Sequence, residues 1–178
     1  MLFRSGSNLA ALIDRMEPAV RIVAVASNRA DALALDRAEE EGIETAVFPR
    51  GDDPAARDWA LYRWLAERDV ELVVLAGFME LLTEQLVGRL PVINVHPSLL
   101  PAFPGLRAWE QALAAGVETT GVTVHFVDAG LDTGPVIAQR EVPVLADDTP
   151  EALHGRIQMV EHELLPDVVA RFAADLVA

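Results

Sequence analysis

Residues 71–76, Glu-Leu-Val-Val-Leu-Ala, are the clearest indication of fold class in this sequence. Their apolar side chains are consecutive rather than alternate, which is typical of a parallel strand that helices cover on both faces. Shorter strand patterns lie at residues 21–26, 45–48 and 92–95. Before and between these strands, apolar residues recur at helical spacing over three segments, residues 8–16, 30–41 and 55–68. This alternation predicts βαβ units, and therefore a mostly parallel sheet with right-handed crossovers.

The C-terminal part of the sequence predicts a different strand pairing. After a helical pattern at residues 108–115, two strand patterns follow at residues 121–126 and 135–141. The connection between these two strands is too short for a crossover helix, so they are expected to pair antiparallel.

The last helix is predicted from its start signals. Thr149 is expected to be the N-cap and Pro150 the first helical residue. Pro166 has no backbone N–H and is expected to end or kink this helix. Together the elements predict one α/β domain over residues 1–178. It has three layers, with helices on both faces of a Rossmann-like, mostly parallel sheet and an antiparallel pair of C-terminal strands.

The composition argues against several classes of function. The 178 residues include 14 Lys and Arg against 28 Asp and Glu, a net charge of −14, and no cysteine. A disulfide scaffold, a thiolate nucleophile and a cysteine-based zinc site are therefore excluded. The negative charge argues against duplex nucleic acid or an anionic membrane as a partner, because both bind positively charged surfaces. No basic segment precedes an apolar one at the N-terminus, so a cytoplasmic protein is expected.

Residues 94–105, Asn-Val-His-Pro-Ser-Leu-Leu-Pro-Ala-Phe-Pro-Gly, follow a predicted strand at the edge where open α/β sheets bind ligands. Asn94 and His96 are two residues apart, so their side chains are expected to point the same way. Asn94 can donate an amide N–H to a developing oxyanion, and His96 can transfer a proton at neutral pH. From this pair alone, a turn asparagine and a packed histidine are the more frequent outcome.

Asp132 lies in the connection between the last two predicted strands, in the sequence Leu-Asp-Thr-Gly-Pro. A carboxylate beside a histidine raises the histidine pKa and fixes its tautomer. The alternative is an aspartate that caps a turn.

Two helices carry further candidate ligand-binding residues. Gly6, Ser7 and Asn8 open the first helix, where backbone N–H groups favour an anion, although Ser7 can equally be a simple N-cap. Gln158 and Glu161 are three residues apart on the last helix, so they can reach one ligand together or face solvent. The four histidines, His96, His125, His154 and His162, lack zinc-binding spacing, so no metal is predicted.

Several motifs resemble those of the folate-dependent formyltransferases. These are NVHPSLLP at residues 94–101, GVTVHFV at 121–127 and LDTGP at 131–135. Within that superfamily, four further motifs resemble the branch that acts on glycinamide ribonucleotide: GSNL at residues 6–9, ASN at 26–28, LAGFM at 75–79 and QMVEH at 158–162. The motifs cover nearly the whole chain and occur in the same order.

This resemblance implies transfer of a formyl group from the co-substrate 10-formyltetrahydrofolate to the amine of glycinamide ribonucleotide, in purine biosynthesis. Asn94 and a protonated His96 would stabilise the tetrahedral oxyanion. Asp132 would keep His96 charged and oriented and would assist proton transfer. The resemblance implies small-molecule substrates, no metal, and a monomer or homodimer. Two alternatives stay open: another enzyme that uses 10-formyltetrahydrofolate, such as formyltetrahydrofolate hydrolase, or an inactive ligand-binding relative.

The resemblance also implies two sets of ligand-binding residues. Those for glycinamide ribonucleotide are Gly6, Ser7, Asn8, Gln158 and Glu161. Those for the folate are Arg57, Met79, Glu80, Leu81, Leu82 and Asp128.

Two features depart from the family pattern. Residues 1–5 are fewer than the family usually has before the segment at Gly6, so the first strand is expected to be short or missing. Glu80 replaces a basic residue that many relatives carry beside the folate.

Overall fold

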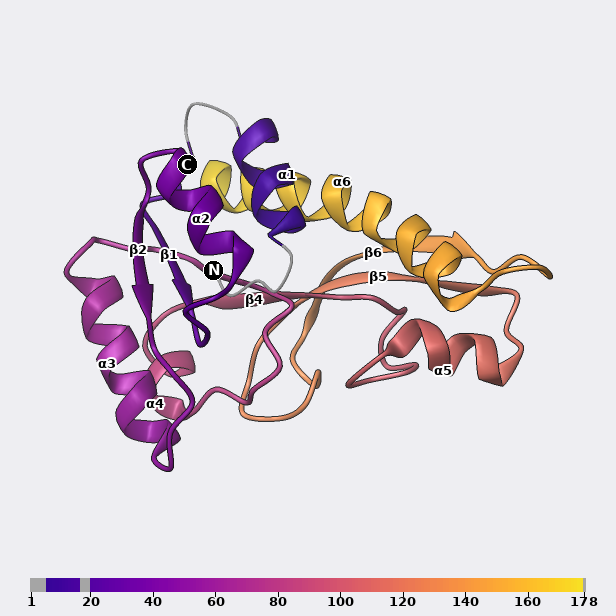
Figure 1. Ribbon diagram of the computed structural model, residues 1–178, viewed down its shortest axis with the longest axis horizontal. Coiled ribbons are helices and arrows are strands. Elements are labelled where there is room, and N and C mark those ends of the chain that lie inside the picture. The colour runs from indigo at the N-terminus through magenta and orange to yellow at the C-terminus, as the bar shows by residue number, and fades with distance from the viewer. Residues whose placement is uncertain (1–5, 17–19, 178) are drawn as a thin grey trace.

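The computed structural model describes residues 6–16 and 20–177 of the chain (Figure 1). It contains helices and strands close to those predicted, with boundaries within three residues except at the end of the last helix, and one additional short helix, α4. The helices are α1 (Ser7–Arg15), α2 (Leu33–Glu40), α3 (Pro54–Ala66), α4 (Glu84–Val87), α5 (Ala108–Ala115) and α6 (Pro150–Val177). The strands are β1 (Ala24–Ser27), β2 (Glu44–Val47), β3 (Val73–Ala76), β4 (Val92–His96), β5 (Thr119–Phe126) and β6 (Val136–Pro143).

The described strands form two sheets. β1 and β2 pair parallel, and the second sheet has the order β3-β4-β5-β6. β3 and β4 are parallel, whereas β5 pairs antiparallel with β6, which confirms the predicted C-terminal pair. The antiparallel part is larger than predicted, because β5 also pairs antiparallel with β4. That second pairing sets Asn94 directly opposite His125.

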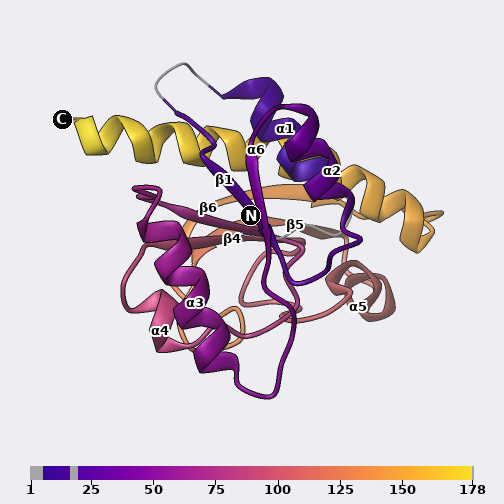
Figure 2. The same ribbon diagram turned by 60° about the vertical axis from the view of Figure 1, so that its left-hand side comes forward.

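Helices cover both faces of the sheets, as the sequence predicts (Figure 2). Val74 and Ala76 of β3 belong to a core cluster that also contains residues of α1, α2 and α6. The alternate residues Val73 and Leu75 belong to a second cluster with residues of α3 and α4. Because successive side chains of a strand point to opposite faces, β3 is buried on both sides, and the predicted three-layer architecture is confirmed.

Helix α6 begins as predicted but does not end as predicted. Thr149 is its N-cap, and its Oγ1 accepts a hydrogen bond from the Ala152 N–H at 3.2 Å. Of the two outcomes expected for Pro166, an end of the helix is wrong, because α6 continues to Val177, and a kink stays a prediction. Buried residues lie on both sides of the proline, namely Leu164, Leu165, Val168 and Val169. Their packing offsets the backbone hydrogen bond that proline cannot make.

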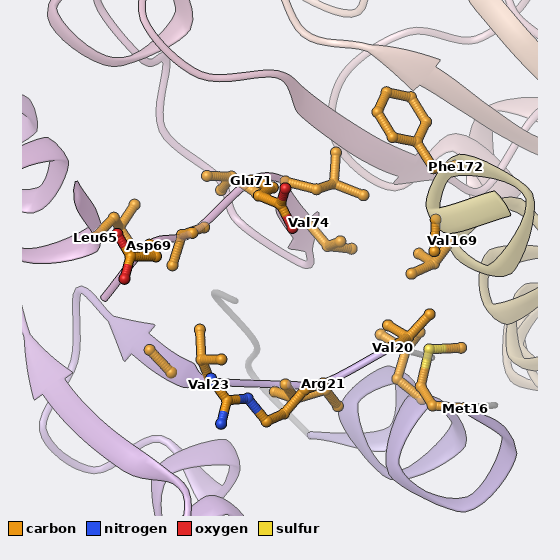
Figure 3. Close-up of a pocket in the computed structure, with 17 residues that line it drawn as sticks. Met16, Val20, Arg21, Val23, Leu65, Asp69, Glu71, Val74, Val169 and Phe172 are labelled. Atoms are coloured by element: carbon orange, nitrogen blue, oxygen red, sulfur yellow. The ribbon is translucent and has the colours of Figure 1, made fainter. Parts of the chain in front are cut away.

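A cavity of about 270 Å³ lies between the two sheets (Figure 3). Residues 20–24 line it on one side and residues 69–74 on the other, and Val169 and Phe172 of α6 complete it. Among the described strands, β1 pairs only with β2 and β3 only with β4, so both strand edges beside this cavity are unpaired. The predicted short or missing first strand concerns residues 1–5, which lie outside the described residues.

Candidate active site

A larger cavity, of about 730 Å³, adjoins the carboxyl ends of β3 and β4. This is the edge at which open α/β sheets bind ligands. The cavity shares no lining residue with the one between the sheets. Most of the predicted site residues line it: Ser7, Asn8, Met79, Glu80, Leu81, Leu82, Asn94, His96, Asp128, Asp132, Gln158 and Glu161. Segments that are far apart in the sequence, from α1 to α6, therefore meet around one cavity.

His96 and Asp132 lie together in this cavity, as the sequence analysis anticipates. The Nδ1 atom of His96 is 3.4 Å from Oδ2 of Asp132, and its Nε2 atom is 2.9 Å from the carbonyl oxygen of Phe103. A protonated imidazole has an N–H on each nitrogen, and each nitrogen here faces an acceptor. The site thus supplies the acceptors that an imidazolium at His96 requires.

The Asp132 carboxylate connects two loops of the cavity wall. Its backbone has φ of 53°, in the left-handed region that aspartate adopts more readily than most residues. Its Oδ2 atom accepts a hydrogen bond of 2.8 Å from the Gly105 N–H, and its Oδ1 atom lies 3.7 Å from Nε2 of His125. The carboxylate is therefore held against His96 by the loop after β4.

The loop after β4 is held by buried hydroxyl groups. Ser98 Oγ donates to the carbonyl of Ala102 at 2.5 Å. Thr123 Oγ1 donates to the carbonyl of Ser98 at 2.7 Å and accepts the Leu100 N–H at 3.0 Å. Because Thr123 is opposite His96 in the β4–β5 ladder, this network fixes the loop that places the Phe103 carbonyl on His96.

Asn8 and Glu161 join helices α1 and α6 at the cavity. Asn8 Nδ2 donates to Glu161 Oε2 at 3.0 Å, and both side chains are buried. Burial raises the pKa of Glu161 to about 7, and the hydrogen bond from Asn8 acts in the opposite direction. The Oδ1 atom of Asn8 is buried without a partner in the described part of the chain. Such an acceptor is costly to bury unless a ligand or water donates to it.

Gly6 has a backbone role in this part of the structure. It is the N-cap of α1, with φ of 71°, and it does not line the cavity. A Cβ at this position would lie 3.2 Å from Cα of Ala34, so the backbone conformation and the close packing of α2 both favour glycine. Ser7 and Gln158, by contrast, line the cavity beside Asn8 and Glu161.

The predicted folate residues form another part of the wall. Met79 and Leu81 are exposed, whereas Leu82 is buried. The Glu80 carboxylate accepts hydrogen bonds from Asn28 and Arg57.

Asp128 also lines the cavity and belongs to the connection between β5 and β6. Its Oδ1 atom accepts hydrogen bonds from Thr133 Oγ1 at 2.7 Å and from the Gly130 N–H at 3.0 Å. These bonds lower the pKa of Asp128. The Asp128 carboxylate therefore stabilises the turn that contains Asp132.

Arg57 lies behind the cavity wall and not in the cavity. Its guanidinium forms ion pairs with Asp58, at 2.8 Å, and with Glu80, and donates to the carbonyl of Leu81 at 3.3 Å. Asp58, fully buried, also accepts the Thr83 N–H at 2.6 Å. Arg57 and Asp58 thus hold the loop after β3, and Arg57 is not free to bind an anion.

Four further cavity residues have no role assigned by the sequence analysis. They are Arg107, Trp109, His125 and His154. The rings of Trp109 and His154 stack with centroids 4.0 Å apart. Among the described residues that line the cavity, Arg107 is the only lysine or arginine, and its exposed side chain lies 3.3 Å from Glu110. His125 falls within one of the quoted motifs, whereas Arg107 and Trp109 carry no sequence signal that distinguishes them from surface residues.

Residues 6–16 and 20–177 contain neither a metal-binding cluster nor a membrane-spanning helix. No group of three or more histidines or acidic residues there is arranged to hold a metal ion. No helix in the same residues is long and apolar enough to cross a membrane.

Comparison with known proteins gives sequence relatives over almost the whole chain. Residues 1–169 match the sequence profile described as formyl transferase. The chain is 43% identical over 180 residues to the phosphoribosylglycinamide formyltransferase of Escherichia coli (strain K12), with 95% of this chain and 83% of that protein covered. It is 45% identical over 180 residues to the trifunctional purine biosynthetic protein adenosine-3 of Drosophila pseudoobscura pseudoobscura, with 95% of this chain covered. The chain spans 13% of the length of that trifunctional protein.

The fold is shared with solved structures. The crystal structure of glycinamide ribonucleotide transformylase 1 from Symbiobacterium toebii matches with a TM-score of 0.92 and 42% identity, over 98% of this chain and 86% of that chain. The predicted Rossmann-like α/β fold is therefore confirmed by comparison as well as by its layers. Sequence and fold together show that this chain belongs to the formyl transferase family.

Proposed function

We propose that this protein transfers the formyl group of 10-formyltetrahydrofolate to the amine of N1-(5-phosphoribosyl)glycinamide in purine biosynthesis, as one cytoplasmic catalytic domain over residues 1–178. The observation that carries the proposal is the convergence of Asn94, His96 and Asp132 on one cavity in a chain of this family. The alternatives, a hydrolase or an inactive binding protein, have no feature of their own in this site.

The cavity has two regions of different chemistry, which fit two different substrates. The loop over residues 77–82 supplies the apolar side chains of Phe78, Met79, Leu81 and Leu82, which suit the flat pterin ring of the folate. The N-terminal end of α1 and the interior of α6 supply polar side chains. Ser7 and Asn8, at the helix N-terminus, suit the phosphate, and Gln158 and Glu161 suit hydroxyl groups of the ribose. Asn94 and His96 line the same cavity as both regions, so the amine and the formyl carbon would meet beside them.

In the proposed reaction, the substrate amine attacks the formyl carbon, a C–N bond forms and the carbonyl electrons move onto oxygen. Asn94 donates an amide N–H to that oxyanion, and His96 donates its Nε2–H in exchange for the Phe103 carbonyl. Asp132 accepts the opposite N–H of His96 and, through water, takes the proton that the attacking amine loses. The bond from the formyl carbon to the folate nitrogen then breaks, and that nitrogen takes, through water, the proton that Asp132 has accepted. Only protein groups and water act in these steps.

The proposed function is tested by the release of tetrahydrofolate from 10-formyltetrahydrofolate. Release that depends on glycinamide ribonucleotide is expected, with formyl-glycinamide ribonucleotide as the other product. Release without any acceptor would identify a hydrolase instead. Binding of both ligands without turnover would identify an inactive relative.

Asp132→Asn is expected to lower kcat about 10- to 100-fold, because hydrogen bonds to charged groups contribute about 1.5–3 kcal/mol. The amide removes the negative charge beside His96 but keeps the shape and one acceptor for the Gly105 N–H. Steady-state kinetics with both substrates measures the loss. Asp167→Asn, on the exposed ion pair with Arg140, is the matched control and is expected to retain wild-type kcat. An Asp132→Asn enzyme with unchanged kcat would remove Asp132 from the proposed mechanism.

Arg107→Ala is expected to raise the KM of an anionic substrate about 3- to 10-fold, with little change in kcat. Both proposed substrates are anions, the protein carries a net charge of −14, and Arg107 is the only guanidinium among the described residues that line the cavity. KM values for the two substrates, measured separately at low and high salt, identify which anion it meets. Arg140→Ala, which removes an exposed charge outside the cavity, should leave both KM values unchanged. Equal KM values for wild type and Arg107→Ala would contradict this assignment.

A further inference from the structure

The proposed mechanism assigns no role to His125, a buried polar side chain that lines the cavity. It is 2% exposed and stands on β5 directly opposite Asn94 of β4. Its Nε2 atom is 3.2 Å from Nδ2 of Asn94, and its Nδ1 atom is 2.7 Å from the carbonyl oxygen of Phe126. Both ring nitrogens therefore have close partners in the protein.

The partner at Nδ1 determines the tautomer. A carbonyl oxygen can only accept, so Nδ1 of His125 carries the hydrogen and donates it to Phe126. Burial lowers the pKa of His125 and outweighs the opposing effects of the Phe126 carbonyl and of Asp132. The ring is consequently neutral at pH 7, and its Nε2 atom presents a lone pair.

The lone pair at Nε2 in turn determines how the Asn94 amide is turned. With Nδ2 toward His125, one amide hydrogen points at the lone pair and the second remains for a ligand. With the amide reversed, its oxygen would face that lone pair at about the same distance, and two acceptors would oppose each other. Only the first orientation is compatible with a neutral His125.

When His125 is neutral, it does not compete with His96 for a hydrogen bond to the Asp132 carboxylate. Nε2 of His125 lies 3.7 Å from Asp132 Oδ1, and Nδ1 of His96 lies 3.4 Å from Oδ2. A hydrogen on Nε2 of His125 would compete with His96 for the same carboxylate. Because His125 donates to the Phe126 carbonyl through Nδ1, its Nε2 atom has no hydrogen to give to Asp132. Of the two histidines, only His96 therefore donates to that carboxylate.

We propose that His125 is a positioning residue, which fixes the Asn94 amide with its free N–H available to the reacting oxygen. The catalytic part of this inference rests on the proposed function, since it assumes that Asn94 acts on the oxyanion. The tautomer of His125 and the orientation of Asn94 do not depend on any activity.

The first test is nitrogen NMR of the histidine rings in the ligand-free protein. His125 is expected to be neutral with hydrogen on Nδ1 at pH 7, and assignment uses the loss of its signals in His125→Gln. Hydrogen on Nε2, or a charged ring, would overturn the proposal. Because this measurement needs no turnover, it is independent of the proposed reaction.

The second test compares substitutions by kinetics. His125→Leu removes the acceptor and is expected to lower kcat about 10-fold or more, with KM changed less than about 3-fold. His125→Gln places Oε1 near the position of Nε2 and should recover most of the lost rate, whereas His125→Asn, which is too short to reach Asn94, should not. Equal rates for the Gln and Asn variants would overturn the proposal, and this comparison stands even if His125→Leu does not fold.

A double-mutant cycle separates positioning from general damage. In an Asn94→Ala background, His125→Leu should reduce kcat by less than about 2-fold further, because the group that it positions is already gone. Independent, multiplying losses would show that His125 does not act through Asn94. Val124→Ala, a truncation of the neighbouring residue on the opposite face of β5, controls for lost stability and is expected to keep wild-type kcat.

Discussion

Asn94→Ala and His96→Ala are each expected to lower kcat by about 10² or more, the loss typical of removing one donor from a preorganised oxyanion site. Both side chains belong to β4 and line the cavity. Each is held in place by hydrogen-bond partners within the protein, in the absence of any ligand. Asn94 is held by His125, and His96 by Asp132 and the Phe103 carbonyl. Because these donors are already oriented before the reaction begins, their loss should appear in the transition state.

The measurement that checks this prediction is kcat together with direct titration of both ligands. Each variant should still bind glycinamide ribonucleotide and the folate with affinities within about 10-fold of wild type. His162→Ala, on α6 and outside the cavity lining, is the matched histidine control and should keep wild-type kcat. Variants that bind both ligands and turn over at the wild-type rate would refute the catalytic assignment of Asn94 and His96.

The features of the fold that the sequence predicts are those with a local cause. The consecutive apolar residues of 71–76 identify a strand buried on both faces, and β3 is such a strand. The two-residue spacing of Asn94 and His96 places them on one side of β4, as strand geometry requires. Pro166 is the exception, because the packing of α6 on the sheet outweighs the local effect of proline.

The features that the sequence does not predict depend on contacts between distant segments. Glu80 is bound by Asn28 and Arg57, which are 52 and 23 residues away in the sequence. Arg57 pairs with both Glu80 and Asp58, so the carboxylate that replaces a basic residue has a cationic partner, and Arg57 leaves no free cation. Arg107 becomes the cation of the cavity only because α5 packs beside α6. Neither the ion pair of Glu80 with Arg57 nor the position of Arg107 in the cavity can be predicted from residue spacing.

The acidic composition of the protein bears on how the cavity can bind an anionic ligand. A net charge of −14 disfavours anionic substrates at long range, and the cavity itself contains the carboxylates of Glu80, Asp128, Asp132 and Glu161. Three of these carboxylates have hydrogen-bond donors of the protein within 3.0 Å, and Glu80 is bound by Asn28 and Arg57. Local donors therefore compensate the charge in the cavity, and Glu161 has the weakest such support because its one described donor is the neutral amide of Asn8.

Glu161→Gln is expected to stabilise the ligand-free protein by about 3 kcal/mol above pH 8 and by little below pH 5. Burial raises the pKa of Glu161 from 4.5 to about 7. Between these two values the native state binds more protons than the unfolded state, so the free energy of unfolding falls as pH rises through this interval. Above pH 7 the carboxylate is charged in both states and the penalty is constant. Glutamine has no charge to bury and can still accept the Asn8 N–H.

Denaturant unfolding of wild type and variant at pH 5 and pH 8 measures this difference, and titrations common to both proteins, such as those of the histidines, cancel in it. Glu163→Gln, on the exposed ion pair with Arg140 in the same helix, should change the free energy of unfolding by less than about 1 kcal/mol at either pH. A Glu161→Gln effect that is equal at both pH values would show that burial does not perturb this carboxyl group. The protein thus keeps a charge that costs stability at neutral pH although Asn8 is its one described donor, which is expected of a side chain that also forms hydrogen bonds with a ligand. The same substitution should therefore weaken binding of glycinamide ribonucleotide while it strengthens the fold.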